Sequence, residues 1–111
     1  MGKDTKKQLM KAETLYKAMQ YKKAARLFNS LGNTFLNNSN YDLARDCFSN
    51  AAMCLINEEK YSLGLKFFRN AGNSSLFKNN YLEAQNFFKD ALKYVTKVRN
   101  NTERNFYYII F

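Results

Sequence analysis

Residues 41–56 read YDLARDCFSNAAMCLI, and this block decides the fold because it recurs every 20 residues. Equivalent blocks begin at the other tyrosines of the series, Tyr21, Tyr61 and Tyr81. Phenylalanine occupies the eighth position of each block, at Phe28, Phe48, Phe68 and Phe88. Self-similarity at a fixed period is the sequence signature of repeat proteins. The chain is therefore predicted to stack one structural unit several times.

Within a block, the apolar and small residues concentrate at positions 1, 4, 8, 11 and 15. This spacing follows one face of an α-helix, and the alternation expected of a strand is absent. Each block is predicted to form one amphipathic helix, and connectors of about four residues force neighbouring helices to run antiparallel. Residues 5–20 repeat the pattern more weakly. We therefore predict an all-α fold of about five antiparallel helices with a 20-residue helix period.

Small residues and asparagines mark where the helices would touch and where they would end. Position 4 is always Ala or Gly, and glycine recurs at Gly32, Gly64 and Gly72. Glycine inside a helix costs about 0.5–1 kcal/mol relative to alanine, so close packing of helices is the expected reason for these glycines. The blocks end in asparagine-rich or charged stretches, where Asn is expected to adopt the left-handed backbone that ends helices.

The composition narrows the classes of function. The 111 residues contain no histidine, 46% apolar residues, and a net charge of +9 from 18 Lys plus Arg against 9 Asp plus Glu. Histidine is the commonest general base and metal ligand, and two cysteines cannot form a four-ligand zinc site. The sequence therefore predicts no catalytic residue, no metal, no cofactor and no small-molecule substrate. The acids that fall outside the apolar stripe should be solvated and without a basic partner; they are Asp42, Asp46, Glu58, Glu59, Glu83 and Asp90.

The two thiols bear on the compartment. Cys47 and Cys54 are seven positions apart, about two helical turns, which is too far for a disulfide. Free thiols, no signal segment and no apolar run of about 18 residues are typical of a cytoplasmic protein. Peripheral contact with membranes is compatible with the same features.

A pair of blocks resembles the tetratricopeptide signature, through Phe28, Leu31, Gly32 and Phe35 in the first block and Tyr41, Ala44, Phe48 and Ala51 in the second. The pair recurs after 40 residues rather than about 34, so each helix would be about three residues longer than a tetratricopeptide helix. Blocks such as YDLARDCFSNAAMCL and YLEAQNFFKDALKY are similar to the N-terminal helical sheet of the soluble NSF attachment proteins. The resemblance covers residues 9–98 and implies a right-handed αα-superhelix, with one repeat domain over residues 1–100.

For function, the resemblance implies a protein-interaction adaptor that binds SNARE complexes in vesicle trafficking and membrane fusion. It carries over no individual functional residue, because the partner contacts of that family are dispersed basic side chains. The chain departs from the family by stopping after about five predicted helices, and by lacking an aromatic and glycine-rich loop between the first two.

Eight cations form the candidate partner-binding ridges: Lys22, Lys23 and Arg26 on the second predicted helix, Lys66 and Arg69 on the fourth, and Lys89, Lys93 and Lys97 on the fifth. A basic surface attracts an acidic partner, such as a SNARE bundle, an acidic peptide, an anionic membrane or RNA. Nucleic acid is disfavoured because the aromatic residues are needed for the core. The main alternative to the SNARE adaptor is a tetratricopeptide-type scaffold or co-chaperone module that binds an acidic peptide.

Residues 101–111 form an apolar tail that reads NFYYIIF from Asn105 onward. If the period holds, this tail begins a sixth helix. Two explanations stay open for it: the truncated end of a longer solenoid, or a cap that folds back over the last helix.

Overall fold

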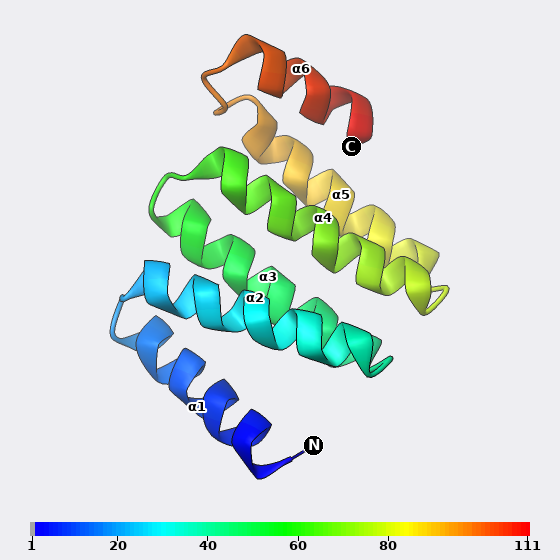
Figure 1. The fold of residues 1–111 in the computed structure, drawn as a ribbon. Coiled ribbons are helices and arrows are strands. Elements are labelled where there is room, and N and C mark those ends of the chain that lie inside the picture. Colours follow the sequence, from blue (N-terminus) through cyan, green and yellow to red (C-terminus); the bar gives the residue numbers. More distant parts are fainter. Residues whose placement is uncertain (1) are drawn as a thin grey trace.

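Six α-helices build the protein in this computed structural model, which describes residues 2–111 (Figure 1). They are α1 (Lys3–Lys17), α2 (Tyr21–Asn37), α3 (Tyr41–Asn57), α4 (Tyr61–Phe77), α5 (Tyr81–Val95) and α6 (Asn101–Ile110). The helices contain 83% of the described residues, and no strand occurs among them. The predicted all-α fold is confirmed.

The 20-residue period extends one helix further than the predicted count of about five. After Tyr21, Tyr41, Tyr61 and Tyr81, the next helix begins at Asn101. The apolar tail is thus helical, and α6 buries Tyr107 against a cluster that α3, α4 and α5 also supply. Its helical state follows from the period and from Asn100, whose side chain accepts a hydrogen bond from the backbone N–H of Glu103 at 3.0 Å.

The helices form two layers. Each helix packs mainly against its neighbours in sequence, consistent with a helical repeat. In Figure 1, α2 and α4 cross in front of α3 and α5, and α1 lies beside α2 at the bottom of the stack. The Cα atoms extend over 43 × 33 × 17 Å, so the stack is a flattened slab in which each helix keeps an outer side.

The first four turns share one backbone geometry. Each has three residues, where connectors of about four were predicted, and its middle residue has a φ of 59° or 60°; these residues are Met19, Ser39, Glu59 and Asn79. In the α2–α3 turn, the N–H of Asn40 donates to the carbonyl of Phe35 at 2.8 Å and the N–H of Ser39 donates to that of Leu36 at 3.0 Å. These are the two bonds of a Schellman motif.

The expectation that asparagine supplies the left-handed residue is right only at Asn79. At the other three turns, the geometry is imposed on Met, Ser and Glu, whose side chains have no special affinity for it. The hydrogen bonds that close the Schellman motif are therefore the stronger influence on the backbone at these positions.

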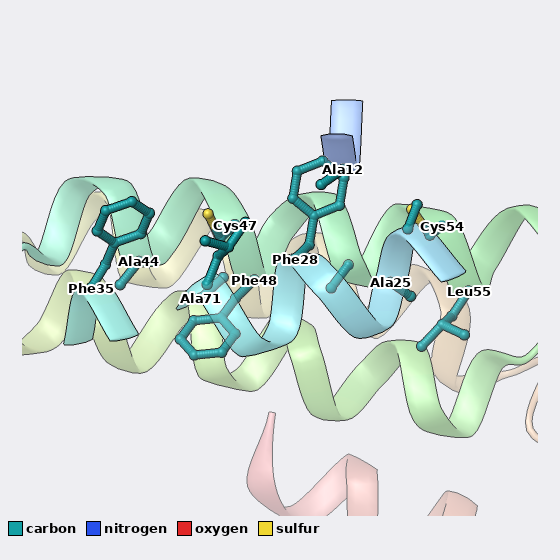
Figure 2. Close-up of a cluster of buried hydrophobic side chains, with 13 residues drawn as sticks. Ala12, Ala25, Phe28, Phe35, Ala44, Cys47, Phe48, Cys54, Leu55 and Ala71 are labelled. Atoms are coloured by element: carbon teal, nitrogen blue, oxygen red, sulfur yellow. The ribbon is translucent and has the colours of Figure 1, made fainter. Parts of the chain in front are cut away.

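Two overlapping clusters make the core. Figure 2 shows the first, in which Phe28, Phe35 and Phe48 lie among alanines of α1, α3 and α4. The second joins α3 to α6 through Phe68, Val95 and other apolar residues. Because α3 and α4 contribute to both clusters, the core is continuous along the stack.

The glycines permit close contact, as predicted. A Cβ added at Gly32 would lie 2.8 Å from the ring of Phe48 on the next helix, and one at Gly72 would lie closer still to the ring of Phe88. At Gly64, the added carbon would meet Ile56 at 2.9 Å. Gly32 and Gly72 are equivalent in successive helix pairs, so the ring-over-glycine contact is a repeating part of the packing.

The last helix departs from this geometry. Its connector has five residues, 96–100, and the buried residue is Tyr107 rather than Tyr108, which occupies the phenylalanine position of the repeat. The preceding helix carries Leu92 where α2 and α4 carry glycine, so an aromatic ring cannot pack there as Phe48 does. The hydroxyl of Tyr107 instead donates to the backbone carbonyl of Ser62 on α4 at 2.9 Å.

Candidate functional site

The predicted cations are all exposed, and the structure distributes them over both layers. Lys22, Lys23 and Arg26 lie on α2, and Lys66 and Arg69 lie on α4. These two helices share a layer (Figure 1). Lys89 and Lys93 lie on α5 in the other layer, and Lys97 follows the end of that helix.

Acidic residues are unevenly distributed among the helices, which the overall composition does not show. Neither α2 nor α4 contains a single Asp or Glu, whereas α1, α3, α5 and α6 each contain at least one. Within residues 2–111, none of the five cations on α2 and α4 has a carboxylate oxygen within 4.0 Å. We call these five residues the basic face: Lys22, Lys23, Arg26, Lys66 and Arg69.

The repeat explains why this face is coherent. Arg26 and Lys66 both occupy position 6 of their blocks, and Arg69 lies one turn further along α4. Since α2 and α4 run in the same direction in one layer, equivalent positions point to the same side of the slab (Figure 1). The asparagines Asn33 and Asn73 occupy position 13 of the same two helices and add uncharged polar groups.

A groove between α1 and α2 continues the basic face. It has a volume of about 470 Å³ and is lined by Lys11, Leu15, Lys23, Arg26, Leu27 and Ser30. Three cations thus stand beside two leucines without a lining acid. Lys11 was missed from the sequence because α1 matches the repeat weakly, so its position relative to α2 could not be read from the blocks.

The far side of α1 has the opposite character. A groove of about 310 Å³ between α1 and α3 is lined by Glu13, Asp46 and several uncharged residues. The helix α1 therefore separates a basic groove, shared with α2, from an acidic groove, shared with α3. The two layers thus differ in charge on either side of α1.

Two of the three cations on and just after α5 have individual partners. Lys93 is 3.2 Å from Asp90, and the amine of Lys97 lies 5.7 Å from the ring centroid of Tyr61. Lys89 lines a groove with apolar residues of α4, α5 and the C-terminus, among them Tyr81 and Phe111. The structure thus leaves this group on a different surface from the basic face.

The prediction that the acids lack basic partners is wrong for five of the six: Asp42, Asp46, Glu58, Glu83 and Asp90, of which Glu58 is the most distant, with Lys60 at 4.0 Å. Arg45 on α3 donates to Glu83 on α5 at 2.8 Å and to Asp42 at 3.1 Å, and it contacts Asp46 at 2.9 Å. The amine of Lys78 lies 2.6 Å from Asp42, which links the α4–α5 turn to α3. We call Asp42, Arg45, Lys78 and Glu83 the α3–α5 network.

Glu83 is only partly exposed because it sits where α3, α4 and α5 meet. Its partial burial acts to raise its pKa, but hydrogen bonds from Ser75 and Arg45 outweigh burial and hold the pKa below its ordinary value. The pKa of Asp42 is lowered mainly by its hydrogen bond from Lys78. One local signal was available in the sequence: Asn80 caps α5 by accepting from the N–H of Glu83 at 3.2 Å, a capping-box pattern.

Both cysteines are buried and free, and they lie on α3 beside the aromatic core (Figure 2). Burial raises the pKa of Cys47 to about 12 and that of Cys54 to about 11. Both thiols are therefore protonated at neutral pH, a state in which they are poor nucleophiles.

Residues 2–111 contain no group of three or more His, Cys, Asp or Glu side chains arranged to hold a metal ion. Over the same residues, no helix combines the length and the apolar character needed to cross a bilayer.

Comparison with known proteins adds no family assignment. A scan against protein-family profiles, a search of curated proteins and a search of solved structures each found no match to this chain.

Proposed function

We propose that this chain is a non-catalytic adaptor of the cytoplasm that binds an acidic protein surface through its basic face. The observation that supports this proposal best is the absence of carboxylates from α2 and α4. By the resemblance of its repeats to soluble NSF attachment proteins, the proposed partner is a SNARE complex, and the proposed setting is vesicle trafficking and membrane fusion.

The energetics favour a partner that supplies carboxylates. Exposed cations without a nearby acid retain their full long-range field, which accelerates encounter with an anionic surface. Each contact at the rim of such an interface contributes little, so several cations acting together are required. Screening over about 10 Å at 0.1 M salt should then weaken binding steeply as ionic strength rises.

The architecture suits this role. A flattened two-layer stack presents an extended surface, and such surfaces are the usual binding faces of helical-repeat proteins. We include in the proposal a right-handed superhelical twist of the stack, in keeping with the tetratricopeptide resemblance.

The test is retention of a purified SNARE complex by the immobilised chain at low and moderate salt. The triple reversal Arg26→Glu, Lys66→Glu and Arg69→Glu should reduce retention at least tenfold, while thermal unfolding stays nearly unchanged because all three side chains are exposed. The matched control is Lys89→Glu, Lys93→Glu and Lys97→Glu, which changes the net charge equally on the other layer. Retention that is insensitive to salt, or equal in the two triple variants, would contradict the proposal.

The groove between α1 and α2 favours one alternative, a tetratricopeptide-type scaffold that binds an acidic peptide. Leu15 and Leu27 offer an apolar floor that a peptide side chain could cover, beside Lys11, Lys23 and Arg26. In that case Lys11→Glu should abolish binding of an acidic amphipathic peptide. The SNARE complex should then show no salt-sensitive retention.

A further inference from the structure

The turn between α4 and α5 differs in chemistry from the other turns of the repeat. Positions 17 and 2 of successive blocks flank each turn. They are polar in the first three turns, as Lys17 and Lys22, Asn37 and Asp42, and Asn57 and Ser62. In the α4–α5 turn the same two positions are Phe77 and Leu82. Three equivalent turns fold with polar residues there, so the fold itself does not require apolar ones.

The apolar side chains of the α4–α5 turn are exposed. Phe77 is 61% exposed, Tyr81 67% and Leu82 70%, and Leu76 beside them is 39% exposed. The equivalent tyrosines of the other blocks, Tyr21, Tyr41 and Tyr61, are only partly exposed. Phe77 stacks on Tyr41 with ring centroids 5.8 Å apart, yet most of its surface remains in water. Packing within the chain therefore leaves this apolar surface without a partner.

We propose that this turn, the α4–α5 tip (Leu76, Phe77, Lys78, Tyr81 and Leu82), inserts into the headgroup region of an anionic lipid membrane. The inference does not depend on the proposed protein partner, since it concerns the end of the stack rather than the basic face. Interfacial insertion of this kind requires no membrane-spanning helix.

The shape of the tip favours a lipid surface over a protein groove. The α4–α5 turn projects from one end of the slab (Figure 1). A projecting apolar turn can penetrate the loosely packed headgroup layer, where a tyrosine places its ring among acyl chains and its hydroxyl among polar groups. Tyr81, whose hydroxyl donates to Asn79 at 3.3 Å, has this amphipathic arrangement.

The charges at the tip favour anionic lipid. Two carboxylates lie beside the tip: Asp42 is engaged by Lys78 at 2.6 Å and by Arg45 at 3.1 Å, and Glu83 is engaged by Arg45 at 2.8 Å. The described carboxylates beside the tip are thus neutralised within the protein. The start of α1 lies along the same edge of the slab, beyond the α2–α3 turn (Figure 1), and it carries Lys3, Lys6 and Lys7 against one acid, Asp4. An anionic surface that receives the tip would also meet these cations.

A tryptophan reporter tests the insertion directly, because the chain contains no tryptophan. In the Phe77→Trp variant, emission should shift to the blue when vesicles of phosphatidylcholine and phosphatidylserine are added, and brominated lipid should quench it. Met10 is 60% exposed in the middle of α1, and the Met10→Trp variant should show neither effect. Unchanged emission of the Phe77→Trp variant, or equal shifts in the two variants, would overturn the proposal.

Vesicle co-sedimentation gives a second readout. The double variant Phe77→Asn with Leu82→Ser installs the pair that the α3–α4 turn carries naturally, so the fold should tolerate it, as thermal unfolding would verify. Its partition onto vesicles containing phosphatidylserine should fall roughly tenfold or more, given the apolar area removed. Met10→Ser should partition like the wild-type chain. Equal sedimentation of the double variant and the wild type would contradict insertion. A double variant that sediments with vesicles like the wild type but no longer retains the SNARE complex would also contradict it.

Discussion

Four residues carry the same backbone strain at the same point of the repeat. Met19, Ser39, Glu59 and Asn79 each have a left-handed φ, which costs a residue with a side chain about 1–2 kcal/mol. The cost is offset because the following N–H groups close hydrogen bonds to the preceding helix, as from Lys60 to Leu55 at 2.9 Å. Each turn therefore keeps a conformational cost that a single substitution to glycine would remove.

Glu59→Gly should stabilise the protein by about 1 kcal/mol, because glycine adopts this backbone without a steric penalty. The measurement is urea unfolding followed by circular dichroism. The control is Glu58→Gly, one residue earlier in the same turn, where φ is −94° and glycine offers no such relief. An equal gain in the two variants would show that the left-handed backbone is not the cause.

Helix-to-helix contact depends on rings placed over glycines. Phe48 is 1% exposed and its ring lies 2.8 Å from where a Cβ on Gly32 would be, so an added methyl group must push against a fully buried ring. Phe88 lies over Gly72 in the same way but is only partly buried, so it can yield. Equivalent contacts in the repeat thus differ in their tolerance of change.

Gly32→Ala should destabilise the protein by about 1–3 kcal/mol despite the better helix propensity of alanine, because overpacking at a fully buried ring dominates. Gly72→Ala should cost less. A double-mutant cycle with Phe48→Leu checks the mechanism. The variant that combines Gly32→Ala with Phe48→Leu should lose less stability than the two single variants lose together. Additive effects would remove the ring contact as the explanation.

The α3–α5 network joins two helices of one layer through charge. The pKa of Glu83 is depressed in the folded protein, so its contribution to stability is present above the unfolded value of about 4.3 and is lost as pH falls through the lower folded pKa. Glu83→Gln should therefore be less stable than the wild type at pH 7 by roughly 1 kcal/mol, and the gap should close as pH falls through the lowered folded pKa of Glu83.

Thermal unfolding, measured from pH 7 down to acidic pH, gives the difference in stability between Glu83→Gln and the wild type. Glu59→Gln, which changes a carboxylate in the α3–α4 turn, should keep the acid response of the wild type. Parallel pH profiles for Glu83→Gln and the wild type would contradict a stabilising role for the pair formed with Arg45.

At the scale of the whole molecule, the sequence predicted the helices better than the site. Tyrosine and phenylalanine recur with a fixed spacing, so helix starts at Tyr21 to Tyr81 followed from local pattern alone. The pairing of Arg45 with Glu83 joins residues 38 positions apart and depends on how the layers assemble, which no local pattern encodes. The basic residues were identified correctly as exposed, but their division between two layers required the three-dimensional arrangement.

The nearest-neighbour packing of the stack has a consequence for folding. Most contacts join helices that are adjacent in sequence, so no loop of many residues must close before native contacts form. Such a chain can nucleate within any helix pair and extend in both directions. The central pairs, α2 with α3 and α3 with α4, share the first core cluster and form the natural nucleus. The last helix, which has one fully buried residue, can then open and close while the centre stays folded.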